Sequence, residues 1–305
     1  MITATNVTKR FERHVALEEL TCEIPKGCVY GLVGSNGAGK STFLRIVTGV
    51  YRPDKGSLCV EGWPVYERPA IKERMAFVPD ELYFLPQATL TRMEAFYAAS
   101  YPRFDRKRFA QLTEAFGLDP GARLGTFSKG MRRQSAILLT LSTMADYLFF
   151  DETFDGLDPV MRSFVKRILY ADMAERGATV VVTSHSLREL EDTCDQLALL
   201  HAGRILFDSD VQNLKTSLFK VQAAFGFEYD ASLFEGIDVV RMSRQGSVSS
   251  LIVRGDRDAV SAHIRGNNPT LFEILPLSLE EVFVHEMEAL GYAFDDAVPE
   301  GEDKK

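Results

Sequence analysis

A glycine-rich loop near the N-terminus constrains this chain more than any other feature. Residues 34–42 spell GSNGAGKST and match the phosphate-binding pattern G-x-x-x-x-G-K-[ST]. The apolar run 28–33 before the loop predicts a buried strand, and residues 42–47 predict the start of a helix. The N-terminus of that helix would face bound phosphate groups. The loop therefore predicts nucleotide binding, but it leaves open which nucleotide is bound and how its energy is used.

The residue types in this loop suit a triphosphate. The glycines let successive backbone N–H groups turn inward around an anion. Lys40 can reach the β and γ phosphates, and the Ser41 hydroxyl can bind Mg²⁺. A glycine-rich turn without a ligand is the alternative, and the flanking strand and helix patterns disfavour it. The predicted contacts to the nucleotide are Gly34, Ser35, Asn36, Gly37, Ala38, Gly39, Lys40, Ser41 and Thr42.

Length and charge narrow the class of protein. The chain has 305 residues, 46% of them hydrophobic, which leaves room for one large globular domain and a small one. Its net charge of −8 argues against broad nucleic-acid binding, which needs a basic face. The four cysteines have no C-x-x-C spacing, so we expect reduced thiols. With no long apolar run and no signal-peptide pattern, we expect the chain to reach a membrane only through a partner.

The first part of the chain predicts an α/β domain over residues 1–215. The short apolar runs 148–150 and 180–182 are typical of parallel strands that are covered on both faces. They alternate with helical segments, which predicts a mostly parallel sheet. Residues 88–145 are predicted to form a helical subdomain, and Thr91 to Glu94 fit a capping box at its start.

The sequence pattern changes after residue 215. Residues 216–292 predict a small α/β accessory domain, because apolar and polar residues alternate from Phe219 to Phe227. We expect a strand pair to turn at 244–247 and a capping box to start a helix at 278–281. The domain could regulate, contact a second subunit or form a lid, and packing that steadies a dimer is the favoured interpretation. The polar, acidic tail 293–305 is predicted to be disordered.

Two further segments carry candidate catalytic residues. The apolar strand 148–150 ends in Asp151 and Glu152. Adjacent side chains at a strand end point in different directions, so Asp151 can address Mg²⁺ while Glu152 orients an attacking water. His185 follows the 180–182 strand and could hydrogen-bond the γ-phosphate. The alternatives, an acidic turn and an ordinary loop histidine, are disfavoured by the phosphate loop upstream.

In their order along the chain, these motifs resemble an ATP-binding-cassette (ABC) ATPase over residues 1–215. FSKGM at 127–131 stands where the family has its signature, commonly LSGGQ. Residues 148–152 resemble the Walker B strand with its catalytic glutamate, and 154–158 resemble the D-loop. His185 stands at the place of the switch histidine.

The resemblance implies a head-to-tail homodimer or heterodimer of cassettes. Each ATP would lie between the phosphate loop of one subunit and the signature of the other. Ser128 and the Gly130 N–H, at a helix start, would then bind a γ-phosphate held by the second subunit. The resemblance also adds Asp158 to the nucleotide site and places Phe11 where an aromatic ring stacks on adenine. An ordinary core aromatic is the alternative for Phe11.

Three residues depart from the family pattern. Lys129 replaces a glycine of the signature, and Met131 replaces its glutamine. Where relatives carry the Q-loop glutamine, this chain has Asp80. Asp80 could accept a hydrogen bond from a Mg²⁺-bound water and so contribute to the metal site. Its negative charge near the γ-phosphate costs binding energy unless the metal offsets it.

The resemblance implies an ATP- and Mg²⁺-dependent ATPase subunit of a membrane transporter. SKGM at 128–131 and the LEEVF segment at 279–283 resemble the bacterial drug and antibiotic export group, whose subunits pair with a separate integral-membrane permease. The expected location is the cytoplasmic face of the cell membrane, and the segment 82–86 is a candidate permease-docking surface whose alternative is ordinary packing.

Two other functions stay open at this point. A soluble ABC ATPase acting on translation or DNA is the first, although such relatives usually carry two cassettes or long coiled coils, which this chain lacks. A P-loop GTPase is the second, and the chain has no Asn-Lys-x-Asp motif for guanine.

Overall fold

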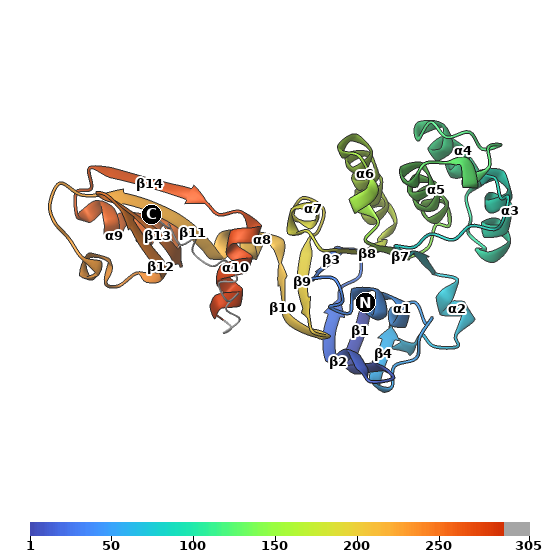
Figure 1. Cartoon of the computed structure of the whole chain (residues 1–305), viewed down its shortest axis with the longest axis horizontal. Helices are drawn as coiled ribbons and strands as arrows, with labels where there is room; N and C mark the ends of the chain where they lie inside the picture. The colour runs from blue at the N-terminus through green and yellow to red at the C-terminus, as the bar shows by residue number, and fades with distance from the viewer. Residues whose placement is uncertain (290–305) are drawn as a thin grey trace, which may run out of the picture. The chain divides into compact units, whose positions relative to one another are not determined.

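The computed structural model describes residues 1–289, apart from the side chains at positions 215, 217, 286, 287 and 289 (Figure 1). The chain forms two compact units, Met1–Asp210 and a second that begins at Val211. The tail 293–305, which the sequence predicts to be disordered, lies outside the described residues. Each unit is described by itself.

The first unit contains an antiparallel sheet with the strand order β2-β1-β4-β5. Its strands are β1 (Ile2–Phe11), β2 (His14–Ile24), β4 (Lys55–Val60) and β5 (Trp63–Pro64). β1 and β2 form a hairpin in which Phe11 pairs with His14. The hairpin places Phe11 at the end of its strand, next to a tight turn.

A second sheet in this unit has the order β10-β9-β3-β8-β7-β6, and all its neighbours are parallel except β9 and β10. The strands are β3 (Val29–Val33), β6 (Met75–Val78), β7 (Tyr147–Asp151), β8 (Thr179–Ser184), β9 (Gln196–His201) and β10 (Arg204–Asp210). Every residue of β3, β7 and β8 is buried, as expected for parallel strands covered on both faces. Because β3, β8 and β7 are neighbours, the loops after them meet at one edge of the sheet.

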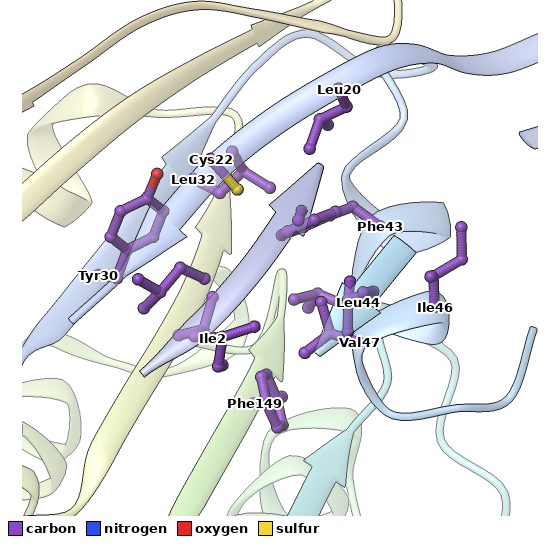
Figure 2. Packing of buried hydrophobic residues seen from close by; sticks show 14 of the residues in the cluster. Ile2, Leu20, Cys22, Tyr30, Leu32, Phe43, Leu44, Ile46, Val47 and Phe149 are labelled. Atoms are coloured by element: carbon purple, nitrogen blue, oxygen red, sulfur yellow. The ribbon is translucent and has the colours of Figure 1, made fainter. Parts of the chain in front are cut away.

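Helix α1 (Lys40–Val47) packs between the two sheets. Figure 2 shows Phe43 and Leu44 of this helix among Ile2 of the antiparallel sheet and Phe149 of the parallel sheet. The opposite face of the parallel sheet is covered by α5 (Lys129–Ser142), α6 (Pro159–Arg176) and α7 (Leu187–Glu191), as Figure 1 shows. Full burial of one such apolar side chain contributes about 1.5–3 kcal/mol, so this core fixes the orientation of α1 behind the phosphate loop.

The helical part contains α3 (Leu90–Ser100), α4 (Arg106–Ala115), the 3₁₀ turn η1 (Leu124–Thr126) and α5, and the short α2 (Pro69–Lys72) precedes β6. The capping box predicted at Thr91 is wrong. Thr89 caps α3 by accepting from the Arg92 N–H at 3.2 Å. The Thr91 hydroxyl instead donates to the Pro120 carbonyl, and the Glu94 carboxylate pairs with Arg106. These tertiary contacts outweigh the local capping pattern.

The second unit is a four-stranded antiparallel sheet with the order β12-β13-β11-β14. Its elements are α8 (Val211–Ser217), β11 (Leu218–Ala224), the 3₁₀ turn η3 (Ala231–Phe234), β12 (Asp238–Gln245), β13 (Val248–Arg254), α9 (Arg257–Gly266), β14 (Leu271–Pro276) and α10 (Leu279–Ala289). With η3 in the place of a first helix, this is a β-α-β-β-α-β arrangement. The predicted strand pair is confirmed, since Gln245 pairs with Val248. The predicted capping box is also confirmed, because Ser278 and Glu281 each accept from the other's backbone N–H.

Candidate active site

The phosphate loop follows β3 and leads directly into α1. Gly39 has a φ of 112°, a left-handed conformation that favours glycine, and it precedes α1 without a side-chain cap. A Cβ on Gly39 would lie 2.6 Å from the Ala16 carbonyl oxygen, and one on Gly34 would lie 2.3 Å from that of Leu200. The glycines therefore allow tight packing, and the first N–H groups of α1 stay available to an anion.

Lys40 is the first residue of α1 and is almost fully buried. Its Nζ donates to the carbonyl oxygens of Gly34 at 2.6 Å and Ser35 at 3.2 Å. The same Nζ lies 2.9 Å from Oε1 of Glu152, at the end of β7. The structure thus joins the phosphate loop to the predicted catalytic carboxylate through one ammonium group.

Asp151 is fully buried at the end of β7. Its Oδ1 accepts from the Thr183 hydroxyl at 2.7 Å, whereas its Oδ2 is buried with no hydrogen-bond partner within the described part of the chain. Burial raises the pKa of the Asp151 carboxyl, and the neighbouring Ser41 and Thr183 hydroxyls act in the opposite direction. A buried carboxylate oxygen without a partner beside a serine hydroxyl is an oxygen donor set that suits Mg²⁺. Ser41 and Asp151 therefore fit the predicted metal site.

Glu152 lies in a cluster with His185 and Asp155. The Nδ1 of His185 is 2.9 Å from Oε2 of Glu152 and 3.0 Å from Oδ2 of Asp155. The backbone N–H of Glu152 donates to the Thr183 hydroxyl, and its φ of 48° is unusual for a residue with a side chain. Such a backbone conformation persists where the surrounding structure enforces it, as at functional sites.

The carboxyl groups of this cluster have opposite pKa shifts. Burial acts to raise the pKa of Glu152, but hydrogen bonds from Asp155, Lys40 and His185 outweigh it and hold that pKa well below its usual value. Burial and hydrogen bonds with Glu189 and Glu152 raise the pKa of Asp155. These opposite shifts favour an ionised Glu152 beside a protonated Asp155.

Sequence reasoning missed Asp155 as a site residue. The sequence pattern places it only within the predicted D-loop, which the structure forms as the 3₁₀ turn η2 (Phe154–Gly156). The available signal was its spacing, because a turn that follows Glu152 directly returns the chain toward the same strand end.

The predicted signature segment 127–131 starts helix α5. Ser128 is exposed and caps the helix, because its Oγ accepts from the Met131 N–H at 3.2 Å. Asp158 has the same role for α6, where its Oδ1 accepts from the Met161 N–H at 2.9 Å. Gly130 lines a cavity of about 470 Å³ within this chain. The other residues that line it are Asn36, Asp80, Lys129, Arg133, Glu152, Asp155, Gly156 and His185.

Phe11 is exposed at the end of β1, so the alternative of a core aromatic is wrong. The Tyr51 ring contacts it edge-on, with ring centroids 5.4 Å apart, and the Lys9 ammonium lies 5.5 Å from the Phe11 centroid. These contacts orient the ring and leave part of its surface accessible, as stacking on a base requires.

Asp80 follows β6, and its carboxylate contacts Arg133, a partner that the sequence did not predict. Its Oδ1 accepts from Nη2 of Arg133 at 2.7 Å, and its backbone carbonyl accepts from the same nitrogen at 3.2 Å. Arg133 lies near the start of α5, so this carboxylate is tied to the signature helix.

Comparisons with known proteins agree with this geometry. A family model described as ABC transporter matches residues 17–155. The chain is 25% identical to the ABC transporter ATP-binding protein YtrB of Bacillus subtilis, over 93% of this chain and 97% of the relative. It is 34% identical to the daunorubicin/doxorubicin resistance ATP-binding protein DrrA of Streptomyces peucetius, over 71% and 67% of the two chains.

The fold also matches solved structures. An ATP-binding subunit of an ABC transporter superposes with a TM-score of 0.65 at 23% identity, over 70% of this chain and 92% of the other. A dimeric bacterial ABC transporter cassette has a TM-score of 0.63 at 22% identity, over 69% and 99%.

Fold and site together define an ABC ATPase. The chain belongs to the ABC transporter family. It is an ATP-binding and ATP-hydrolysing subunit that powers a transporter, and its relatives do not support action on translation, on DNA or as a GTPase. Within the described residues, no helix is both long and apolar enough to cross a membrane.

Proposed function

We propose that two ABC subunits, of which this chain is one, close on ATP and part after hydrolysis. The contacts of Glu152 with Lys40 and His185 carry this proposal, because they gather a phosphate-binding cation at the start of α1, a carboxylate after β7 and a switch histidine after β8. ATP bridges the subunits when bound, so cutting its terminal bond removes the bridge.

Within one subunit, the predicted residues would bind the phosphates, the adenine and the metal ion of the nucleotide. The loop from Gly34 to Thr42 would bind the phosphates through its N–H groups and Lys40. Phe11 would stack on adenine, and Ser41 and Asp151 would hold Mg²⁺, which neutralises phosphate charge when bound. The domain limits 1–215, 88–145 and 216–292 remain part of this proposal.

Glu152 is the proposed general base. Its ionised carboxylate can accept a proton from the attacking water, and His185 would hold the carboxylate and the γ-phosphate in register. Asp80 stays a predicted contributor to the metal site through a metal-bound water.

The second subunit would complete the site. Ser128 and the Gly130 N–H lie at the exposed start of α5, where a helix N-terminus favours an anion. They would contact the γ-phosphate bound to the other subunit, with Asp158 close by. The second subunit can be an identical chain or a related one.

The transported molecules would be drugs or antibiotics that leave the cell through a separate integral-membrane permease. The names of DrrA and of the bacitracin transport ATP-binding protein BcrA of Bacillus licheniformis support this class, and BcrA is 26% identical over 70% of this chain. The chain would then act at the cytoplasmic face of the cell membrane. Tyr83, 79% exposed in the segment 82–86, offers an aromatic contact to the permease.

The deciding experiment is to co-express the chain with candidate permeases and purify the permease. Recovery of this chain with a multi-span membrane protein, together with ATP-dependent export in vesicles, supports the proposal. Recovery of the chain with ribosomes and with no permease would overturn it.

A further inference from the structure

Arg133 is a buried cation to which the sequence analysis assigns no role. Its side chain is 4% exposed, and its Nη2 holds both the carboxylate and the backbone carbonyl of Asp80, at 2.7 and 3.2 Å. A buried charge without a partner is costly, so the Asp80 carboxylate is what makes this burial tolerable.

The same guanidinium group lies against the D-loop. A Cβ placed on Gly156 would lie 2.6 Å from Nη1 and 3.0 Å from Cδ of Arg133. Gly156 does not have a left-handed backbone, so a side chain there would meet the Arg133 side chain and not a strained backbone. Arg133 thereby links three segments: the loop after β6, the start of α5 and the D-loop.

The neighbouring Arg132 offers a natural control. Its Nη2 donates to the Leu82 carbonyl at 3.4 Å, and its guanidinium carbon lies 6.0 Å from the Phe84 ring centroid. It carries the same charge and is one residue away, but no contact joins it to the Asp80 carboxylate among the described interactions.

The negative charge of Asp80 lies beside the proposed triphosphate site, and Arg133 is placed to neutralise it. Asp80 and Arg133 line the cavity that also contains Asn36, Glu152 and His185. A bare carboxylate there would repel a triphosphate, whereas a carboxylate paired with a guanidinium presents little net charge. Arg133 supplies that compensation from within the chain, whether or not a metal ion is bound.

We propose that Asp80 and Arg133 form a positioning pair of the ATPase site. Arg133 cancels the charge of Asp80 beside the triphosphate and holds the D-loop at Gly156 against the signature helix. The proposal rests on the proposed function for its nucleotide, but the pair itself is a property of the folded chain.

A double-mutant cycle tests the pair in the full-length chain. We would compare Asp80→Asn, Arg133→Gln and the double variant by thermal unfolding and by titration with a fluorescent ATP analogue without Mg²⁺. Arg133→Gln should weaken binding about tenfold, because Asp80 is then uncompensated. The double variant should recover to within about threefold of wild type and should unfold at a higher temperature than Asp80→Asn alone.

The competing role for Asp80 gives the opposite pattern. If Asp80 acts only through a Mg²⁺-bound water, Asp80→Asn and the double variant would both need the same higher Mg²⁺ concentration to bind the ATP analogue. The added substitution at Arg133 would then restore neither affinity nor stability. Additive effects of the two substitutions on unfolding temperature and affinity would also contradict the proposed pair. So would a recovery of the unfolding temperature of Asp80→Asn by Arg132→Gln as well as by Arg133→Gln.

Gly156→Ala tests the D-loop contact separately. The added methyl group should displace the guanidinium group and lower the unfolding temperature in wild type but not in Arg133→Gln. Equal losses in both backgrounds would show that Arg133 does not hold this segment. If the wild-type chain failed to bind the ATP analogue, the proposed function would be wrong. The unfolding temperatures of the Asp80/Arg133 and Gly156/Arg133 variants would still show whether the pair exists in the folded chain.

Discussion

The ammonium group of Lys40, at the start of α1, and the carboxylate of Glu152, directly after β7, lie 2.9 Å apart. Lys40 also holds the carbonyls of Gly34 and Ser35, so one cation joins the phosphate loop to the proposed catalytic carboxylate. A γ-phosphate would compete with Glu152 for Lys40, which would release Glu152 to act on a water. Substitutions at the two residues should therefore have different effects, on ATP binding for Lys40 and on hydrolysis for Glu152.

Glu152→Gln should reduce steady ATP hydrolysis by about 10²–10⁴-fold, the usual contribution of a general base. Binding of ATP should persist, and an ATP-bound dimer should accumulate in size-exclusion chromatography with light scattering. Glu175→Gln, on the exposed face of α6, is the matched control and should behave like wild type. Normal turnover in Glu152→Gln would rule out the proposed role.

Lys40→Ala should weaken ATP binding at least tenfold, because the phosphates lose a buried cation that lies beside the phosphate loop. Equilibrium titration with labelled ATP measures the loss. Lys107→Ala removes an exposed lysine of α4 and provides the control. An unchanged affinity in Lys40→Ala would count against the phosphate-loop assignment.

Phe11→Ala should weaken ATP binding by about tenfold, because stacking of a base on an aromatic ring contributes about 1–3 kcal/mol. Binding of tripolyphosphate, which lacks a base, should not change. Competition titrations with the two ligands compare them directly. Equal losses for both ligands would indicate that Phe11 supports the fold of the hairpin and not the adenine contact.

Asp155→Asn should stabilise the protein more at about pH 8 than at about pH 5. The folded state raises the pKa of Asp155, so its favourable contribution is complete below its ordinary pKa of about 4 and is lost as the pH rises. Asparagine carries no proton to lose and avoids that penalty. Denaturant unfolding at several pH values measures the difference, which should reach on the order of 1 kcal/mol. A difference that does not change with pH would contradict the assignment.

Glu61→Gln should destabilise the chain by about 1 kcal/mol at neutral pH. Paired hydrogen bonds from Arg74, and another from the Tyr147 hydroxyl, lower the pKa of Glu61 to about 2. Because that pKa is lowered, the stabilisation is present above the ordinary value of about 4.3 and is lost as the pH falls toward about 2. The deficit of the variant should therefore shrink in acid unfolding experiments, and a constant deficit would argue against this pair.

The ATPase could be predicted from sequence patterns among residues that are close together in the chain. The phosphate loop needs glycine at positions such as Gly39, with its φ of 112°, and a buried strand on one side with a helix on the other. The acidic end of β7 likewise follows a run of apolar residues that is typical of a covered parallel strand. These requirements act between residues that are close in sequence, so they are visible without a structure.

The tertiary structure alone decided which distant groups meet. It brought Asp80 to Arg133, placed Asp155 beside His185, and joined the Thr91 hydroxyl to the Pro120 carbonyl in place of the expected cap. Each of these contacts depends on the order of strands in the sheet or on how helices pack against it. Sequence spacing does not encode that order, because pairing energies of residues far apart are realised only once the intervening chain has folded.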